Sequence, residues 1–336
     1  MLRFIVRRLI AMVGVVLVLS LLLFFWLRAL PGGPVSAILG ERATASRRAA
    51  LEQALGLDQP VYVQYLRFLE RAIHGDFGVS TQVLPGTDAL EVFWMRLPAT
   101  LELSFFALLI AISLGIPLGY FAARRRGSAL DNGSIVMSLV GVAVPVFFTA
   151  FMLKYYFAVQ WDLFPVSGRQ DPSLDATRVT GFFVLDGILT REWDAAWDAV
   201  LHLALPSVAL ATIPFAVIFR ITRASVLDVL DEDYVRTAEA KGLTSRTIRG
   251  RHVLRNAMLP VTTIIGLQVG GLLAGAVLTE TVFAFGGIGQ ALFESFRDKD
   301  YAVLQVLILA AAAIFVLVNL LVDISYALID PRVRTR

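Results

Sequence analysis

Six long apolar stretches, none of which contains a formally charged residue, alternate with polar segments along this chain. They cover residues 9–27, 103–123, 132–153, 199–219, 256–279 and 301–322. A helix needs roughly 20 mostly apolar residues to cross the hydrocarbon core of a bilayer, which is about 30 Å thick. The pattern therefore predicts six membrane-spanning helices, the third of which can extend past Lys154 toward Trp161.

The first stretch also has the features of a signal peptide, because Arg3, Arg7 and Arg8 precede it. It ends, however, in Arg28-Ala-Leu-Pro-Gly-Gly-Pro rather than in the small-x-small pattern of a cleavage site. We therefore expect this stretch to be retained as a span.

The polar segment of residues 31–98 predicts two short helices. One begins near Ser46 and ends at Gly56, and the other runs from Pro60 to about Ile73. The apolar stripe expected on the second helix consists of Val61, Tyr65, Phe68 and Leu69.

Two further polar segments separate later stretches. Residues 161–198 are acidic and rich in turn-forming residues, and residues 281–300 predict a tight turn followed by a short amphipathic helix. Within the stretches, the pairs Gly115-x-x-x-Gly119 and Gly271-x-x-x-Gly275 predict close approach of neighbouring helices.

Composition and charge placement agree with a membrane protein. Apolar residues make up 57% of the chain and charged residues 17%, whereas soluble domains carry about 25% charged residues. The N-terminus, residues 124–126, residues 220–255 and the C-terminus hold more than half of the 30 Lys and Arg residues. If all six stretches cross the membrane, these four segments lie on the same side of it. The positive-inside rule assigns that side to the cytoplasm, so both termini are expected there.

The basic segment of residues 220–260 predicts a helical hinge. We expect a helix over Ile221–Lys241 and a left-handed stop at Gly242. A cap at Thr244 or Ser245 would open a second helix that runs to about Met258, and Pro260 would begin the fifth span. Small residues at positions 238 and 240 predict a low-relief knob, and the basic residues around it suit either a partner protein or anionic lipid.

Several kinds of chemistry are missing from the sequence. The three lysines (Lys154, Lys241 and Lys299) do not complete a phosphate-binding G-x-x-x-x-G-K-[ST] loop, and no metalloprotease or serine-hydrolase motif occurs. The absence of cysteine excludes disulfides and thiolate metal sites. No carboxylate lies in the middle of a stretch, which weighs against an autonomous ion-coupled carrier or channel. We therefore expect the energy source to lie outside this chain.

Two motifs resemble the EAA loop of binding-protein-dependent ABC importer permeases. They are Tyr234-Val-Arg-Thr-Ala-Glu-Ala-Lys-Gly-Leu and Leu254-Arg-Asn-Ala-Met-Leu-Pro. The whole chain is similar to the B-type subunit of dipeptide and oligopeptide permeases, including Gly75-Asp-Phe-Gly-x-Ser, Pro165-Val-Ser-Gly-Arg, Thr279-Glu-Thr-Val-Phe and Asn319-Leu-Leu-Val-Asp. The chain departs from the pattern of these permeases at three places. Arg236-Thr237-Ala238 stands where ABC importers generally have Glu-Ala-Ala, and Gly286 and Ala302 stand where relatives often have proline.

The resemblance implies an all-α integral membrane protein with the type I ABC importer permease fold, in a bacterial cytoplasmic (inner) membrane. Residues 1–336 would form a single permease domain, with residues 31–98 and 161–198 in the periplasm and residues 220–260 as the coupling loop. The implied partners are a second, C-type permease, two cytoplasmic ATPases that bind ATP and Mg, a periplasmic or lipid-anchored binding protein, membrane lipid and a peptide substrate. No cofactor on this chain, no ATPase site and no nucleic-acid partner are implied.

The resemblance also implies roles for individual residues. Coupling to the ATPase would fall to Tyr234, Arg236, Ala238, Glu239, Ala240, Lys241, Gly242, Arg255, Asn256, Leu259 and Pro260. Glu280, Phe283 and Phe285 would lie near an outer gate. The alternative cargo for the same type of importer is nickel, glutathione or an oligosaccharide.

Overall fold

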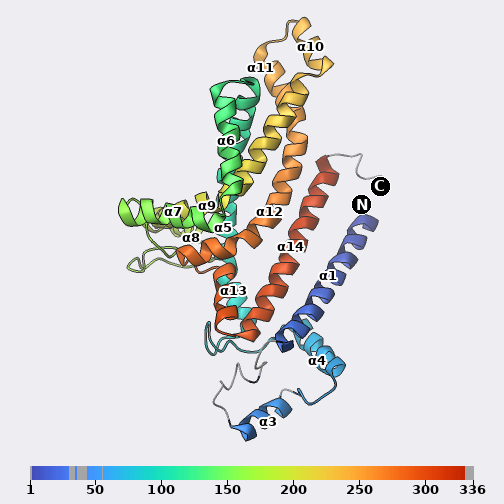
Figure 1. Ribbon diagram of the computed structural model, residues 1–336, viewed down its shortest axis with the longest axis vertical. Helices are drawn as coiled ribbons and strands as arrows, with labels where there is room; N and C mark the ends of the chain where they lie inside the picture. Colours follow the sequence, from blue (N-terminus) through green and yellow to red (C-terminus); the bar gives the residue numbers. More distant parts are fainter. Residues whose placement is uncertain (1, 30–34, 36–43, 55, 330–336) are drawn as a thin grey trace. The chain divides into compact units, whose positions relative to one another are not determined.

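The computed structural model describes residues 2–29, 35, 44–54 and 56–329, and all of the regular elements among them are helices. The chain divides into two compact units, Met1–Pro98 with Gly286–Leu320 and Ala99–Phe285 with Leu321–Arg336. We call them the first and the second unit and describe each by itself. Figure 1 shows the helices with their labels.

Among its described residues, the first unit contains four complete helices and parts of two others. The complete helices are α1 (Leu2–Ala29), α3 (Ala45–Ala54), α4 (Val61–Ile73) and α13 (Ile288–Arg297). The unit also holds the start of α5 (Ala89–Arg124) and most of α14 (Tyr301–Ile329). Gly56, with a φ of +64°, follows α3 as predicted, and Pro60 is the N-cap of α4.

Apolar side chains of α1, α4 and α14 form one core of the first unit. Phe24 and Leu27 of α1 pack with Phe68 of α4 and Leu304 of α14. The expected stripe on α4 is therefore confirmed at Phe68, but Val61 at the start of the helix is exposed. A second core joins the first turns of α5 to α13 and α14.

A buried carboxylate fastens the loop before α5 to the turn before α14. Asp300 is fully buried, and its Oδ2 accepts hydrogen bonds from Ser80 Oγ at 2.7 Å and from the backbone N–H groups of Thr81, Gln82 and Val83 at 3.0–3.1 Å. These four donors satisfy the charge that burial would otherwise penalise. The loop and the turn, which lie far apart in the sequence, are therefore held as one piece.

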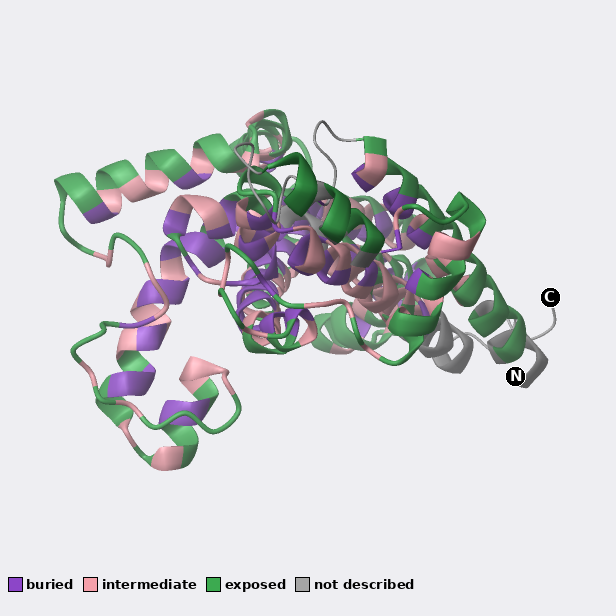
Figure 2. Cartoon of the chain, turned by 90° about the horizontal axis from the view of Figure 1, so that it is seen from below, coloured by how far each residue is buried: buried purple, intermediate pink, exposed green. Residues whose placement is uncertain are grey.

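The second unit is built around α9 (Trp193–Leu230), which contacts α6 (Ala129–Ala143), α7 (Val146–Leu153), α8 (Phe183–Thr190) and α12 (Arg255–Phe283). Its remaining short elements are η1 (Lys154–Gln160), α10 (Asp233–Ala240), α11 (Ser245–Thr247) and η2 (Ile248–Leu254). The helix α9 contains many buried residues, whereas large apolar side chains are exposed along several other helices. Figure 2 shows the exposed residues in green and the buried ones in purple along the chain. Such exposed apolar faces suit contact with lipid or with partner subunits.

The predicted third span is broken in the middle. The helix α6 ends at Ala143, and α7 with η1 continues from Val146 at an angle of 103° (Figure 1). Pro145 lacks an N–H group and its ring disfavours helical geometry in the preceding residue, and Val144 is accordingly extended. The expectation that helix continues past Lys154 to near Trp161 is confirmed, because η1 ends at Gln160.

The helices that could cross a membrane number four among the described residues, or up to six if each of two bent pairs counts as one span. The four are Leu9–Ala29, Ala89–Arg124, Trp193–Leu230 and Tyr301–Leu320. The second bent pair, Ser245–Leu272 with Ala276–Phe283, turns by 53°. All six predicted stretches are thus helical, but two of them bend.

The pair Gly115 and Gly119 makes the predicted close contact, whereas the surroundings of Gly275 lie outside the described residues. A Cβ atom on Gly119 would lie 2.7 Å from the carbonyl oxygen of Phe219, and one on Gly115 would lie 3.0 Å from Ile218 of α9. Glycine at these positions lets α5 approach α9 closely. At Gly271 a Cβ atom would meet nothing within 4 Å, so close packing does not explain that glycine.

Candidate functional site

The first arm of the hinge is the short helix α10, which follows the end of α9. The predicted continuous helix over Ile221–Lys241 is wrong, because α9 ends at Leu230 and Glu232 is extended before α10 begins. Asp231, Glu232 and Asp233 explain the break. Three acidic residues are unfavourable at the negative end of the α9 dipole, but favourable at the positive end of α10.

Gly242 ends the first arm in the predicted left-handed conformation, with a φ of +72°. Leu243 N donates to Ala238 O at 3.3 Å, and Gly242 N donates to Glu239 O at 2.9 Å. These two bonds form a Schellman stop, which satisfies the last carbonyl groups of the helix. The glycine is therefore needed for the backbone turn, since no neighbouring atom crowds it.

The second arm begins at the predicted cap, where Thr244 Oγ1 accepts a hydrogen bond from Thr247 N. From there α11, η2 and α12 follow without a break, so the expected end near Met258 is wrong. Pro260 lies inside α12 rather than at the start of a new helix. A proline inside a membrane helix is tolerated where its surroundings compensate the freed backbone carbonyl.

Apolar contacts and one polar bond join the two arms. Val235 and Ala238 of α10 pack with Ile248, Val253 and Ala257 of the second arm. The same cluster includes Ala123 at the end of α5 and Val226 of α9.

The polar bond runs between two predicted coupling residues. Asn256 Nδ2 donates to Tyr234 Oη at 3.0 Å and to the His252 carbonyl oxygen at 2.9 Å. The sequence offered no signal for this pairing, because 22 positions separate Asn256 from Tyr234.

The outer surface of the hinge is polar and mostly basic. Most of the predicted coupling residues are exposed, namely Tyr234, Arg236, Glu239, Ala240, Lys241, Gly242, Arg255, Asn256, Leu259 and Pro260. Ala238 is the exception. It is 4% exposed and faces the interior of the hinge, so the expected knob does not include it. Its small side chain allows the two arms to pack closely.

The three residues predicted for an outer gate are all buried at the other end of α12. Glu280 is fully buried, and its Oε1 accepts a hydrogen bond from Thr100 Oγ1 of α5 at 2.6 Å. Phe283 packs with Ala150, Ala158 and Leu205, whereas Phe285 belongs to a different cluster with residues of α5 and α9. The structure therefore places these residues at one helix end but in separate contacts.

A buried ion pair beside these residues was not predicted. Arg169 Nη2 lies 2.7 Å from Glu102 Oε2 and also donates to the carbonyl oxygen of Gly181 at 2.8 Å. The guanidinium lies 3.7 Å from the ring centre of Phe183 and 5.7 Å from that of Phe285. Burial lowers the pKa of Arg169, although the nearby Glu102 carboxylate acts to raise it.

This ion pair connects the loop after η1 to α5 and α8, because Glu102 Oε1 also accepts a hydrogen bond from Val184 N at 2.9 Å. Two features of the sequence pointed to the residues of this ion pair. They are the motif Pro165-Val-Ser-Gly-Arg, which ends in Arg169, and the position of Glu102 at the edge of an apolar stretch. Neither signal identified the partner.

Cofactor-binding features are scarce in the part of the chain that the structure describes. No group of three or more His, Asp or Glu side chains there could hold a metal ion. The histidine His202 instead bonds to its own helix, with Nδ1 2.9 Å from Asp198 O and 3.3 Å from Asp198 Oδ2. The hinge is the candidate functional site because most of the predicted coupling residues are exposed on it.

Known protein families and one solved structure match parts of this chain. Residues 115–335 match the family model described as "Binding-protein-dependent transport system inner membrane component", and residues 1–85 match its N-terminal companion. A chain from a structure entitled "Crystal structure of an amino acid ABC transporter with histidines" covers 72% of this chain and 94% of its own length, with a TM-score of 0.46 and 18% identity.

Three relatives match over nearly their full length. The dipeptide transport system permease protein DppB of Escherichia coli K12 is 44% identical over 99% of both chains. The protein of the same name from Alkalihalophilus pseudofirmus is 41% identical over 99% of this chain and 100% of its own. The di/tripeptide transport system permease protein DppB of Pseudomonas aeruginosa UCBPP-PA14 is 45% identical over 99% of both chains. This chain therefore belongs to the family of inner membrane components of binding-protein-dependent transport systems.

Proposed function

We propose that this chain is the B-type permease subunit of an ATP-driven, binding-protein-dependent ABC importer that moves di- or oligopeptides across the bacterial inner membrane. The observation that carries the proposal is the identity of 41–45% over 99% of the chain with permeases named for dipeptide or di/tripeptide transport. Such a subunit moves the cargo but leaves ATP hydrolysis to other chains.

The proposed topology has six spans with both termini in the cytoplasm. It counts the four long helices and the two bent pairs as one span each. Residues 31–98 and 161–198 then lie outside, and the hinge over residues 220–260 lies inside. The arginine-rich segments support this orientation, since positive charge gathers on the cytoplasmic side.

The proposed assembly contains a second, C-type permease, two cytoplasmic ATPases that bind ATP and Mg, and a periplasmic or lipid-anchored binding protein. An ATPase would contact the exposed surface of α10 and the basic residues beyond Gly242. Movement of α10 would reach α12 through the Tyr234–Asn256 hydrogen bond and through the packing of Val235 and Ala238. We assign Glu280, Phe283 and Phe285 to the outer gate, where α12 ends.

A substitution at Gly242 tests the coupling role. Valine should strain the left-handed turn by about 1–2 kcal/mol, because a β-branched side chain is disfavoured at a φ of +72°. We expect Gly242→Val to reduce ATP-dependent dipeptide uptake severalfold in proteoliposomes that hold the full complex, while the subunit still inserts and assembles.

Two controls accompany this test. Gly242→Asn should keep most uptake, because asparagine tolerates the left-handed region. Gly133→Val, at an exposed helical glycine of α6 outside the hinge, where an added Cβ would meet no atom within 4 Å, should also keep most uptake. Wild-type uptake by a fully assembled Gly242→Val complex would contradict the coupling role.

Two other functions are separable by experiment. An importer of nickel, glutathione or an oligosaccharide would share the same build, so a binding assay on the partner binding protein decides the cargo. An autonomous channel or carrier would transport in vesicles that contain this chain alone, without ATP. Uptake under those conditions would refute the importer proposal.

A further inference from the structure

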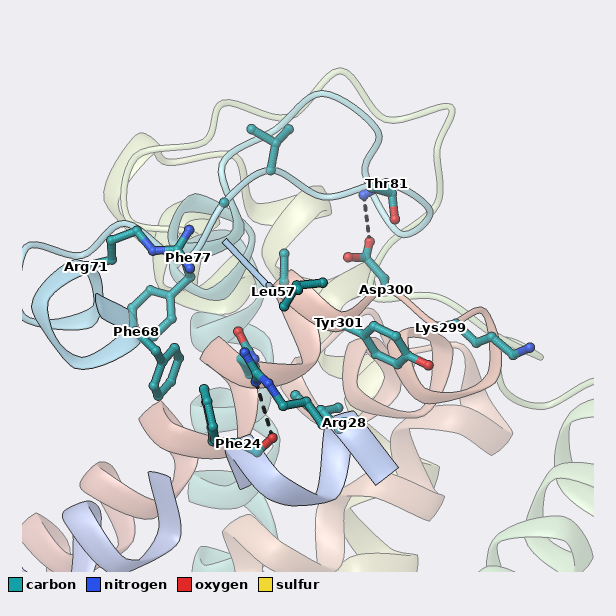
Figure 3. Close-up of a pocket in the computed structure, with 15 residues that line it drawn as sticks. Phe24, Arg28, Leu57, Phe68, Arg71, Phe77, Thr81, Lys299, Asp300 and Tyr301 are labelled. Carbon is teal, nitrogen blue, oxygen red and sulfur yellow. Dashed lines mark hydrogen bonds between the residues drawn. The ribbon is translucent and has the colours of Figure 1, made fainter. Parts of the chain in front are cut away.

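A cavity of about 310 Å³ lies in the first unit, between the ends of α1 and α14, the helix α4 and the loop after it (Figure 3). Its apolar lining includes Phe24, Leu27, Leu57, Phe68 and Phe77. For scale, an engineered cavity of about 150 Å³ holds benzene. This space therefore accepts an apolar group much larger than one ring.

The position of the cavity along the helices sets its depth in a membrane. The residues from α1 lie in the last turns of the candidate span Leu9–Ala29, and Tyr301, Ala302 and Gln305 lie in the first turns of the candidate span Tyr301–Leu320. Both spans leave the hydrocarbon at their ends. The cavity is therefore located at the level of the lipid headgroups.

Two arginines line the cavity beside its apolar walls. Arg28 donates from Nε and Nη2 to Gln64 Oε1 at 3.1 and 2.9 Å and from Nη1 to Phe24 O at 3.4 Å, which leaves two of its five N–H groups. Arg71 is exposed and forms no ion pair with any carboxylate in the described part of the chain. Figure 3 shows both side chains around the labelled phenylalanines.

The carboxylate of Asp300 is the one acidic group among the described residues in the lining of the cavity, against the three cations Arg28, Arg71 and Lys299. It lines the cavity, but its Oδ2 already accepts four hydrogen bonds from Ser80 and from the backbone of residues 81–83. The site is therefore an apolar recess whose lining carries a net positive charge at headgroup depth. That combination complements an amphiphile with a negative charge next to an alkyl chain.

We propose that this cavity binds an anionic phospholipid of the phosphatidylglycerol type, with an acyl chain against the phenylalanines and the phosphate between Arg28 and Arg71. The proposal extends beyond peptide import and does not depend on the cargo. It rests on the membrane-spanning assignment of α1 and α14.

Native mass spectrometry of the detergent-purified full complex tests the proposal. The probes are dioctanoyl phosphatidylglycerol, dioctanoyl phosphatidylcholine and inorganic phosphate. We expect one phosphatidylglycerol molecule to bind more tightly than phosphatidylcholine, and Arg71→Gln to weaken that binding about fivefold, as loss of about 1 kcal/mol from one cation predicts. Val79→Trp, at an exposed position in the cavity wall, should reduce the binding of both lipids.

Arg67→Gln is the matched control. Arg67 is exposed on the same helix, one turn before Arg71, but does not line the cavity, so its variant should bind phosphatidylglycerol like the wild type. Equal binding by the Arg71→Gln and Arg67→Gln variants would overturn the proposal. So would equal affinity for the two lipids, or displacement of phosphatidylglycerol by phosphate at similar concentrations, which would assign the site to a free anion.

Discussion

Asp186 is a fully buried carboxylate that the surrounding backbone keeps ionised. Burial acts to raise the pKa of this group, but hydrogen bonds outweigh it and hold the pKa below the ordinary value. Thr180 donates from Oγ1 at 2.6 Å and from N at 2.8 Å, and Gly181 N donates at 3.0 Å. The carboxylate therefore stabilises the loop before α8 at neutral pH.

The direction of this pKa shift predicts a pH dependence. A lowered pKa contributes stability that is present above the unfolded-state value of about 3.9 and is lost as pH falls through the folded-state value. We expect Asp186→Asn to lower the free energy of unfolding by about 2 kcal/mol at pH 7, because a charged acceptor of several bonds is replaced. The difference from the wild type should shrink below about pH 3.9.

Detergent-based thermal unfolding at pH 7 and at pH 3 measures this effect. Asp194→Asn is the control, because Asp194 is exposed in the first turn of α9. A deficit of the Asp186→Asn variant that is equally large at both pH values would contradict the assigned role of the carboxylate.

At the scale of elements, a bidentate ion pair ties α6 to α9 near the hinge. Arg223 donates from Nε to Asp131 Oδ1 at 2.6 Å and from Nη2 to Asp131 Oδ2 at 2.9 Å. Asp131 also accepts a hydrogen bond from Gly127 N at 2.9 Å in the turn after α5. The pair thus connects that turn to the part of α9 that leads to α10.

Removal of Asp131 should destabilise this connection. We expect Asp131→Ala to lower the free energy of unfolding by about 3 kcal/mol, because the largely buried Arg223 loses its partner. The control is Asp233→Ala, which removes an exposed pair with Arg236 at 3.5 Å and should change stability little. Denaturant titration of the purified chain measures both variants, and equal stability of the two would contradict this account.

At the scale of the whole molecule, the proposed six-span topology makes a direct prediction. The chain contains no cysteine, so single introduced cysteines can report which side each segment faces. Arg126→Cys, Ala240→Cys and Ser173→Cys all replace exposed residues. With a membrane-impermeant maleimide on intact cells or spheroplasts, we expect only Ser173→Cys to react. The other two should react after the membrane is opened, and labelling of Ala240→Cys from the same side as Ser173→Cys would refute the topology.

Much of the helical pattern was predictable from local sequence. Apolar stretches predicted the helices, Gly56 and Gly242 predicted helix ends, and Thr244 predicted a cap, because each depends on backbone geometry and near neighbours. The acidic break after Leu230 and the proline break after Ala143 also had local causes, but a run of apolar or helix-forming residues obscured them.

Only the tertiary structure decided which distant groups meet. The contacts of Asn256 with Tyr234, Arg169 with Glu102 and Asp300 with the loop after Ser80 join residues that sequence spacing does not relate. Likewise, Gly115 and Gly119 pack closely against α9 whereas Gly271 does not, although both pairs share one motif. The sequence by itself determined a helical membrane permease with a capped basic hinge. The folded chain decided which face of that hinge is buried and which distant groups of the chain are paired, because burial and pairing depend on neighbours brought together in space.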